Sequence, residues 1–548
     1  MTDTASRGAD ALTAALAEAG TRRMFTLSGN HIMPVFDAAP GAGIELIHTR
    51  HEAATVHMAD AWARLTGEVG VALVTGGPGH ANAISALYTA SMAESPVLLL
   101  SGHAPTNELG MGAFQEMRQA ELAAPLCKAS WTVRSARALG VDVARALHLA
   151  ASGRPGPVHL SLPVDLLEQV CDASGPAAMP RPDSPPPAIK AAAEQALGML
   201  AQARRPLVLA GPACLHSSLR SRLSELEHAL GLPVIGMESP RGTNDPALGS
   251  FATLLARADL VLLLCKRLDF TLRFGAPGVL GADCKFIQFD PEREEMERSQ
   301  RQLASRLAAS AVADPVQAME ALCAAAGATV VSAAWADEVR QALAWRAPWT
   351  PSAPGSPMHP AQVLAPLQAL LDSDRDAVLV SDGGEFGQWA QACLRAPHRV
   401  VNGVAGAIGA GLSFALAARL AHPQAPVVAA LGDGTFGFHS SEIDTGVRYG
   451  LPFLAVVGND ARWNAEYQIQ LRQYGRERAH GCTLLPTRYD QVAAGFGGYG
   501  ELVTDPAEVL PAAHRALQSG LPAVLNVMME GHPAPAAKPP APAAQGKA

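Results

Sequence analysis

The sequence predicts an α/β protein built from three doubly wound parallel-sheet domains. Short apolar segments alternate with amphipathic helical stretches, as they do in parallel sheets that are covered by helices on both faces. Two Pro-dense segments, residues 172–190 and 346–360, interrupt this alternation and divide the chain into three blocks. The length of 548 residues, with 49% hydrophobic and 17% charged residues, supplies core for several domains and excludes global disorder.

These breaks set the expected domain boundaries. The expected units are an N-terminal domain (1–171), a linker (172–190), a Rossmann-like central domain (191–330), a second linker (331–360), a C-terminal domain (361–530) and a tail (531–548). We expect the Pro/Ala-rich tail to be disordered, although a tail that closes over a ligand would have the same composition.

The expected strands are short apolar runs, and the residues that follow them carry the chemistry. The runs cover 23–28, 44–48, 70–75, 96–101 and 157–162, then 206–211, 232–237, 259–265 and 285–290, and finally 377–382, 426–434, 452–460 and 523–528. Ligands of parallel sheets bind beyond the carboxyl ends of the strands. Gly-, Asp- and His-rich sequences follow several of these runs, so we expect the functional site there.

Composition excludes some partners and compartments. Lys and Arg number 42 against 50 Asp and Glu, a net charge of −8, which argues against a nucleic-acid partner. Eight scattered cysteines without a CxxC pair favour free thiols in a reducing compartment. The N-terminal sequence does not resemble a secretory signal, and the longest apolar runs are too short to span a membrane. We therefore expect a cytoplasmic protein without membrane association.

Two neighbouring strand ends in the third block indicate a divalent cation with phosphate groups. Gly432, Asp433 and Gly434 end one expected strand, Thr435 follows it, and Asp460 ends the next. Parallel strands joined by a helix place both acids at one sheet edge, and Mg²⁺ prefers such oxygen ligands and commonly bridges them to phosphates. A GDG sequence alone is weak evidence, because most are ordinary turns.

The combination of LGDG at 431–434 and VVGND at 456–460 resembles the signature of thiamin-diphosphate enzymes. The resemblance implies a thiamin-diphosphate-binding fold, with a pyrimidine-binding N-terminal domain and a diphosphate-binding C-terminal domain. It also implies that Asp433, Asp460 and the carbonyl of Arg462 bind Mg²⁺. Asp460 departs from the family pattern, which usually has Asn there. Gly432, Gly434 and Thr435 are expected to bind the cofactor beside the metal.

Two further segments of the third block fit this resemblance. SDGGEFGQW at 381–389 stands where the family lines the diphosphate, which implicates Glu385 and Phe386. In NGVAGAIGAGLSFAL at 402–416, Gly406 is expected to offer its carbonyl to the aminopyrimidine, and Ile408 to wedge the cofactor into its bent shape. Taken alone, Ile408 would be an ordinary core residue.

The first block carries the candidate activating acid. TRHEAATVHMADAWARLTG at 49–67 is similar to the family's activating segment and places Glu52 where a carboxyl protonates the pyrimidine. Pro78, Gly79 and Asn82 follow at the expected distance. Without that context, Glu52 would be a solvated charge at a helix start. Since Glu52 and Asp433 lie in different blocks, the resemblance implies a homodimer or homotetramer with active sites between subunits.

Block one is most similar to acetolactate synthases, which suggests residues on the substrate side. Phe114 and Gln115 match a pair at the active-site mouth there, and Lys128 matches a lysine near the substrate channel. For Lys128 a solvated surface position is the alternative. His31, His80 and His103 follow expected strands and are candidates for proton transfer, with His103 the most favoured.

Block two resembles 2-hydroxyacyl-CoA lyases and oxalyl-CoA decarboxylases. There Arg154, Arg267 and Asp290 are candidates for holding FAD, ADP or CoA, and an empty vestigial nucleotide site is the alternative. Neither branch matches throughout. Gln468-Ile469-Gln470 lacks the Trp of the acetolactate synthases, and Phe251 stands where the CoA branch has an arginine for the nucleotide.

The expected activity is a thiamin-diphosphate- and Mg²⁺-dependent cleavage or formation of a C–C bond, acting through a ylid and a carbanion/enamine. An acetolactate-synthase-like decarboxylase and carboligase of 2-oxo acids is the first choice. A 2-hydroxyacyl-CoA lyase or oxalyl-CoA-decarboxylase-like enzyme is the alternative. A non-catalytic homologue would be expected to lack Glu52 or Asp433, and both are present.

Overall fold

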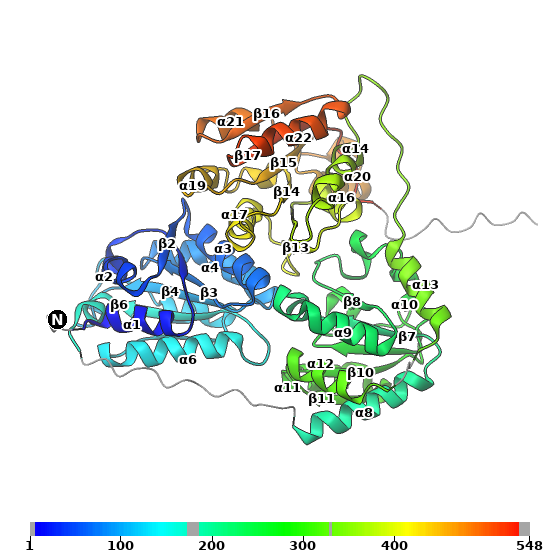
Figure 1. Cartoon of the computed structure of the whole chain (residues 1–548), viewed down its shortest axis with the longest axis horizontal. Coiled ribbons are helices and arrows are strands. Elements are labelled where there is room, and N and C mark those ends of the chain that lie inside the picture. Colours follow the sequence, from blue (N-terminus) through cyan, green and yellow to red (C-terminus); the bar gives the residue numbers. More distant parts are fainter. Residues whose placement is uncertain (1–5, 172–185, 328–330, 536–548) are drawn as a thin grey trace, which may run out of the picture.

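The computed structural model describes residues 6–171, 186–327 and 331–535, and it confirms three α/β domains, each with a parallel sheet (Figure 1). All strand pairs within the named sheets are parallel. Helices cover both faces of every sheet, so the inner strands are buried on both sides.

The N-terminal sheet has the strand order β2-β1-β3-β4-β6-β5. Its strands are β1 (Arg23–Thr26), β2 (Glu45–His48), β3 (Gly70–Val74), β4 (Val97–His103), β5 (Ala129–Thr132) and β6 (Val158–Pro163). Its helices are α1 (Gly8–Glu18), α2 (Met33–Ala38), α3 (Glu52–Thr66), α4 (Pro78–Met92), α5 (Gln119–Ala123), α6 (Leu139–Ala151) and α7 (Val164–Glu168).

The central sheet has the order β11-β10-β9-β7-β8. Its strands are β7 (Pro206–Ala210), β8 (Val234–Gly236), β9 (Leu260–Leu264), β10 (Lys285–Asp290) and β11 (Leu307–Val312). Its helices are α8 (Pro187–Gln202), α9 (Arg220–Leu230), α10 (Ala252–Leu255), α11 (Arg293–Leu303), α12 (Pro315–Ala325) and α13 (Ala333–Ala344).

The C-terminal sheet has the order β13-β12-β14-β15-β17-β16. Its strands are β12 (Val378–Asp382), β13 (His398–Val401), β14 (Val427–Gly432), β15 (Leu454–Asn459), β16 (Tyr499–Val503) and β17 (Ala523–Met528). Its helices are α14 (Pro360–Leu364), α15 (Gln368–Leu371), α16 (Glu385–Cys393), α17 (Gly411–Ala421), α18 (Asp433–Phe436), α19 (Glu442–Arg448), α20 (Asn464–Tyr474), α21 (Tyr489–Gly495) and α22 (Val509–Gln518).

The segment 331–360, expected to be a linker, is extended only in its second part. Helix α13 occupies its first half and packs Trp335, Val339 and Ala342 into the core of the central domain. The Trp335 indole donates a hydrogen bond to the Pro206 carbonyl at 2.7 Å, which fixes α13 beside β7. Most of the first linker, residues 172–185, lies outside the described residues.

Helices α3 and α17 join the N-terminal and C-terminal domains. Ala53, Val56 and Ala59 of α3 share one hydrophobic cluster with Phe414 and Ala418 of α17, and His57 and Arg64 of α3 pack against the Phe414 ring. This contact matters for the site, because α3 begins at Glu52 and α17 follows the loop that carries Ile408.

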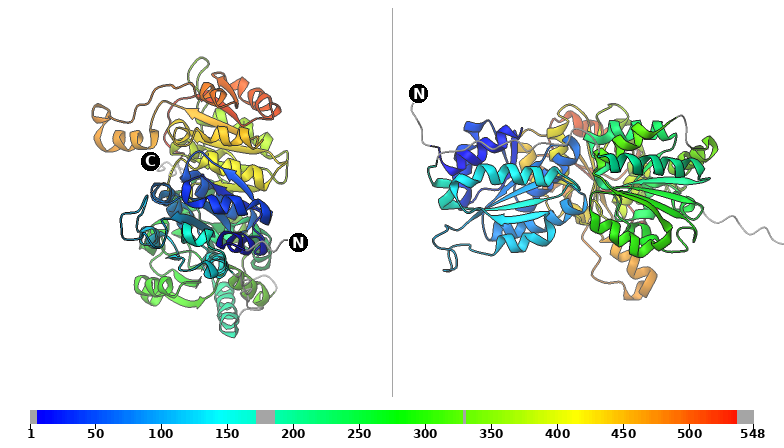
Figure 2. Two further views of the ribbon diagram at one scale, coloured as in Figure 1. Left: turned by 90° about the vertical axis from the view of Figure 1, so that its left-hand side faces the viewer. Right: turned by 90° about the horizontal axis from the view of Figure 1, so that it is seen from below.

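Helix α20 is the least packed helix beside the site. It stands out from the body of the chain with its following loop, as the orange segment in Figure 2 shows, and Asn464 is its only buried residue. No helix within the described ranges is long and apolar enough to cross a membrane.

Candidate active site

Asp433 and Asp460 meet at the carboxyl edge of the C-terminal sheet. Asp433 follows β14, Asp460 follows β15, and these strands are neighbours with Gly432 opposite Gly458. Asp433 accepts hydrogen bonds from the backbone N–H groups of Gly434 at 2.8 Å and Arg462 at 3.2 Å. Burial raises the pKa of Asp433 to about 6. Burial and the neighbouring charge of Asp433 raise the pKa of Asp460 to about 7.

The turn after β15 shapes this edge. Ala461 has a left-handed backbone with φ of 53°, and its N–H donates to Asn459 Oδ1 at 3.2 Å. The turn brings the Arg462 N–H to Asp433 and lays the Trp463 ring over Gly434. A Cβ on Gly434 would lie 2.6 Å from that ring, so only Gly fits there.

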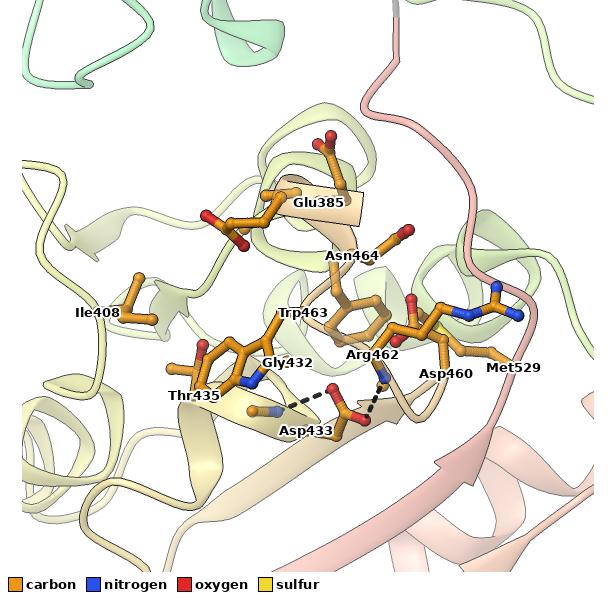
Figure 3. Close-up of a pocket in the computed structure, with 16 residues that line it drawn as sticks. Glu385, Ile408, Gly432, Asp433, Thr435, Asp460, Arg462, Trp463, Asn464 and Met529 are labelled. Carbon is orange, nitrogen blue, oxygen red and sulfur yellow. Dashed lines mark hydrogen bonds between the residues drawn. The ribbon is translucent and has the colours of Figure 1, made fainter. Parts of the chain in front are cut away.

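These acids line a pocket with several segments of the C-terminal domain (Figure 3). The pocket is lined by the start of α16, Ile408, the β14–α18 turn and the β15–α20 turn, together with Met529. It contains these predicted residues: Glu385, Phe386, Ile408, Gly432, Asp433, Gly434, Thr435, Asp460 and Arg462. Phe386 also fills the space beside Gly458, where a Cβ would lie 2.6 Å from its ring.

The donor set of this pocket fits a divalent cation that carries a diphosphate. Two buried carboxylates with raised pKa values repel each other, and a cation between them would remove that cost. Gly432 leaves room at the β14–α18 turn for a ligand, since a Cβ there would meet only Thr435 at 3.6 Å. Glu385 Oε2 is buried with no hydrogen-bond partner among the described residues, and Arg241 Nη2 lies 3.8 Å from it.

Asp382 is a site residue that sequence reasoning missed. It ends β12, is fully buried, and accepts hydrogen bonds from the N–H groups of Gly409 at 3.0 Å and Gly411 at 2.7 Å. Burial raises its pKa to about 6. Asp382 thereby holds the loop that presents Ile408 to the pocket. Its position in the SDGGEF sequence was the available signal.

Gly406, the other predicted residue of that loop, is exposed and does not line the pocket. Its φ of 68° is left-handed, and a Cβ there would lie 3.4 Å from Pro240 of the central domain.

Glu52 lies at the carboxyl edge of the N-terminal sheet, at the first position of α3. Its side chain is 9% exposed, and Asn82 Nδ2 of α4 donates a hydrogen bond to Glu52 Oε2 at 2.9 Å. Pro78 and Gly79 form the first turn of α4, and a Cβ on Gly79 would lie 2.7 Å from Thr75 and 3.4 Å from Glu52 Oε1. The structure therefore brings the four predicted residues of this edge together.

A buried amide organises the same edge. Gln119 accepts a hydrogen bond from the Gly77 N–H at 2.8 Å and donates to the Gly102 carbonyl at 3.0 Å. It thus ties the start of α4 to the end of β4. Gln115 packs on Gly77 with a left-handed φ of 57°.

The other substrate-side candidates of this edge differ in exposure. Phe114 is 67% exposed and stacks on His31, with ring centroids 6.0 Å apart. His103 is buried, and its Nε2 donates to the Met117 carbonyl at 3.0 Å. His80 points into the domain core, where it bonds Ser101 at 2.8 Å and burial lowers its pKa to about 4.

The structure does not bring Lys128 to this site. Lys128 precedes β5 and therefore lies at the amino edge of the parallel sheet, opposite Glu52. Its ammonium group donates to the carbonyls of Leu149 and Ser152, at the carboxyl end of α6. Burial lowers its pKa to about 8. Lys128 caps a helix here.

The structure also corrects the expectation of a nucleotide held by Arg154 and Asp290. The guanidinium of Arg154, from the N-terminal domain, bonds both carboxylate oxygens of Asp290 at 2.7 Å and also contacts Glu94 and Glu292. Arg154 is 5% exposed and Asp290 is fully buried. Arg267 is paired with Glu292 at 3.2 Å. These charges join two domains, and the Arg154–Asp290 pair leaves no free acid for a ribose.

Three family models match the chain, one for each domain. They are described as thiamine pyrophosphate enzyme, N-terminal TPP binding domain (residues 6–122), central domain (193–322) and C-terminal TPP binding domain (382–527). Thiamine pyrophosphate is another name for thiamin diphosphate.

Curated relatives from two groups cover nearly the whole chain. The probable acetolactate synthase of Mycobacterium bovis and the acetolactate synthase large subunit IlvG of Mycobacterium tuberculosis are each 34% identical over 529 residues, 94% of either chain. The 2-hydroxyacyl-CoA lyase 2 of Homo sapiens is 33% identical over 580 residues, which covers 95% of this chain and 90% of the relative.

Proposed function

The chain belongs to the thiamin-diphosphate-dependent enzymes, in the branch of the acetolactate synthases and 2-hydroxyacyl-CoA lyases, and from this premise we propose that it is a Mg²⁺-dependent decarboxylase and carboligase of 2-oxo acids. One observation carries the proposal. The C-terminal sheet edge holds the Asp433–Asp460 pair, and the N-terminal sheet edge holds the Glu52–Asn82 pair, so both halves of the required chemistry are present.

The C-terminal pocket would hold the metal and the diphosphate. Asp433, Asp460 and the Arg462 carbonyl are the proposed Mg²⁺ ligands, and Gly432, Gly434 and Thr435 line the adjoining space. Bound thiamin diphosphate supplies a nucleophilic carbon and accommodates the negative charge left when the substrate loses a carboxylate. Ile408, held by the Asp382 loop, is proposed to support the cofactor's bent shape.

Glu52 is proposed to hold the proton at the cofactor's pyrimidine ring. A carboxyl used in this way must keep one orientation, and the hydrogen bond from Asn82 at 2.9 Å fixes that orientation. Gly79 keeps the space above the carboxyl open, because any side chain there would press on Thr75 and Glu52. Phe114, Gln115 and His103 border the same edge and are the proposed contacts for substrate.

We propose that a second copy of the chain completes each active site. The pocket around Asp433 is lined by residues of the C-terminal domain alone, whereas Glu52 belongs to the N-terminal domain. Large apolar side chains are exposed beside both edges: Phe114, which stacks on His31 at the N-terminal edge, and Phe438, whose ring centroid lies 6.1 Å from that of Trp463 in the pocket.

Subunit mixing tests this arrangement. Glu52→Gln and Asp433→Asn are each expected to abolish activity, and after subunit exchange a 1:1 mixture should recover about a quarter of it. Half of the dimers are then mixed, and each mixed dimer has one intact site. Absence of recovery in dimers proven mixed by mass spectrometry would show that Glu52 and Asp433 act within one chain.

The reaction itself is tested by product NMR. The purified enzyme with thiamin diphosphate, Mg²⁺ and pyruvate should yield acetolactate or acetoin with release of CO₂. Glu52→Gln should lose turnover and retain cofactor binding, and Glu18→Gln, on the exposed end of α1, is the matched control. A cofactor-loaded enzyme that leaves pyruvate unconsumed would contradict the proposal for this donor.

Cleavage of a 2-hydroxyacyl-CoA is the second candidate. The similarity to the human 2-hydroxyacyl-CoA lyase 2, over 95% of this chain, favours it. The same NMR assay with a 2-hydroxyacyl-CoA in place of pyruvate separates the two. Cleavage of the bond between C1 and C2 of the 2-hydroxyacyl-CoA, with the thioester retained on the one-carbon product and no turnover of 2-oxo acids, would select the lyase.

A further inference from the structure

Three potential metal ligands meet at the amino edge of the C-terminal sheet, far from the cofactor pocket along the strands. Asp376 lies two positions before β12, His398 begins β13, and His422 follows the last turn of α17. The ligand atoms of these three residues all lie within 4.8 Å of one another, and the two imidazole rings have centroids 4.2 Å apart. Asp433 and Asp460 lie at the opposite, carboxyl edge of the same sheet.

The backbone fixes two of these ligands in place. His398 stands opposite Val378 in the β12–β13 ladder, and its N–H donates to the Ala377 carbonyl at 3.2 Å. His422 is the C-cap of α17, where its N–H donates to the Ala418 carbonyl. The third ligand, Asp376, is the most exposed of the three and is free to adjust.

The hydrogen bonds leave one nitrogen of each imidazole available as a metal ligand. His398 Nδ1 lies 3.1 Å from Ser217 Oγ of the central domain, and in the tautomer that donates to this hydroxyl the Nε2 lone pair is free. His398 Nε2 is 3.8 Å from Asp376 Oδ1. His422 Nε2 is buried with no hydrogen-bond partner among the described residues. A buried, unpaired imidazole nitrogen is costly unless something binds it.

We propose that Asp376, His398 and His422 form a second metal site, which binds a Zn²⁺-class transition-metal ion. Two imidazoles and one carboxylate are the ligand set that such ions take from proteins, at about 2.0–2.2 Å, with the remaining positions open to water. This set differs from the all-oxygen set of Asp433, Asp460 and Arg462, so the two sites select different metals.

Charges of both signs surround this cluster. Arg220, Arg375 and Arg419 bring positive charge toward it, and Asp374 and Asp376 bring negative charge. Asp374 also accepts a hydrogen bond from the Asp376 N–H at 2.8 Å, which orients the loop before β12.

A metal here would connect three elements of the fold. It would join the start of β12, the start of β13 and the end of α17, and the Ser217 contact would tie the central domain to the same point. Helix α17 packs on α3 and follows the Ile408 loop. The bound ion would therefore be a structural metal that crosslinks these elements behind the cofactor pocket, without contact with the substrate.

The test is a Zn²⁺ titration of the full-length enzyme, with its purification tag removed, in saturating Mg²⁺ and thiamin diphosphate. Saturating Mg²⁺ competes with Zn²⁺ at the Asp433 site, and the histidine variants below distinguish Zn²⁺ bound at the cluster from Zn²⁺ that has replaced Mg²⁺. We expect one additional equivalent of Zn²⁺ per chain and a higher Tm on binding. Co²⁺ in place of Zn²⁺ should give visible absorption bands that indicate nitrogen ligands.

Variants assign the site to these residues. His398→Ala and His422→Ala should weaken Zn²⁺ binding at least tenfold, and Ser217→Ala about tenfold, because outer-shell partners contribute that much to metal affinity. His514→Ala, exposed on α22, is the matched control and should bind like the unmodified enzyme. If His422→Ala does not fold, His422→Gln replaces it, and folding is checked by circular dichroism without Zn²⁺.

Two outcomes would overturn the proposal. One is that the holoenzyme binds no Zn²⁺ tightly. In that case any Zn²⁺ binding would be weak, and its loss in His514→Ala would assign it to the protein surface. The other is unchanged Zn²⁺ affinity and Co²⁺ absorption in folded His398→Ala and His422→Gln. Neither result would affect the proposed reaction, which is measured separately by product NMR.

Discussion

The carboxyl edges of the central and C-terminal sheets both carry a buried aspartate, but the two aspartates have opposite electrostatic surroundings. In the central domain β10 ends at Asp290, and in the C-terminal domain β14 is followed by Asp433, both at the carboxyl edge of a parallel sheet. Asp290 is neutralised by Arg154, which reaches across from the N-terminal domain. Asp433 receives only backbone N–H groups and has a second carboxylate, Asp460, beside it.

The difference shows how one topology can serve binding or assembly. At the central edge the chain supplies its own cation, so the acid contributes to domain packing. At the C-terminal edge the two acids lie side by side and keep raised pKa values despite the nearby charge of Arg462, which supports the proposed metal there. Whether an acid at a strand end marks a ligand site is decided by the side chains that other domains bring to it.

Removal of Asp433 should have the largest effect. Asp433→Asn is expected to weaken Mg²⁺ and thiamin diphosphate binding by at least about 100-fold, since even outer-shell changes cost 10- to 100-fold. The metal-free protein should not lose stability, because one of two repelling buried carboxylates is gone. Isothermal titration calorimetry and thermal melts measure both quantities. Asp444→Asn, on α19, is the control, and cofactor binding that survives in Asp433→Asn would remove Asp433 from the metal site.

Removal of Arg154 should affect stability in place of binding. Arg154→Met is expected to cost about 3–5 kcal/mol of unfolding free energy, because it leaves Asp290 and Glu94 buried without their counter-ion. Urea denaturation measures this loss. The triple variant R154M/E94Q/D290N should recover most of it. Arg267→Met, whose side chain is 26% exposed, should cost less, and an equal loss would contradict the distinction.

The pH dependence of Mg²⁺ binding is the next effect in size. Asp460 has a pKa of about 7 without metal, so it is mostly protonated at pH 6 and mostly ionised at pH 8. Because Mg²⁺ needs the ionised form, its affinity should rise about tenfold over this interval. The same raised pKa means that the metal-free fold loses stability from this group as pH rises through 7. Titrations at three pH values check this, and Asp460→Asn should flatten the rise.

The smallest expected effect is that of nucleotides at the carboxyl edge of the central sheet. Saturating ADP or FAD should leave the Tm unchanged, since Arg154 already occupies Asp290. Differential scanning fluorimetry is sufficient to test this. A stabilisation that Asp290→Asn abolishes would show that the ion pair opens to admit a nucleotide.

The prediction of the fold from sequence was confirmed, and the strands it missed have a common cause. These strands, β5, β11, β13 and β16, are all edge strands. An edge strand is covered on fewer sides and carries more partly exposed residues, as β5 and β11 do, so it lacks the continuous apolar run that identifies an inner strand. Lys128 was expected near the substrate because β5 was missed. Without that strand, the sequence could not show that Lys128 lies at the amino edge of the sheet.

Predicted site residues line one pocket in the structure where they lie in short motifs after inner strands. The pocket residues from Glu385 to Arg462 are of this kind. Site prediction failed where a contact joins distant segments. The pairing of Arg154 with Asp290 and the meeting of Asp376, His398 and His422 depend on how domains and helices pack, and no local spacing encodes them.

The first residues of the tail are expected to slow the dissociation of bound cofactor. Residues 531–534 run beside the pocket, where Asn464 and Trp389 donate hydrogen bonds to the carbonyls of His532 at 2.9 Å and Pro533 at 3.0 Å. A Cβ on Gly531 would lie 2.9 Å from Asp460, so the chain passes directly over that proposed metal ligand. This segment braces α16 and α20, which both border the pocket. Its contribution should therefore be visible in the residence time of bound cofactor, and a chain shortened after Glu530 should exchange it faster.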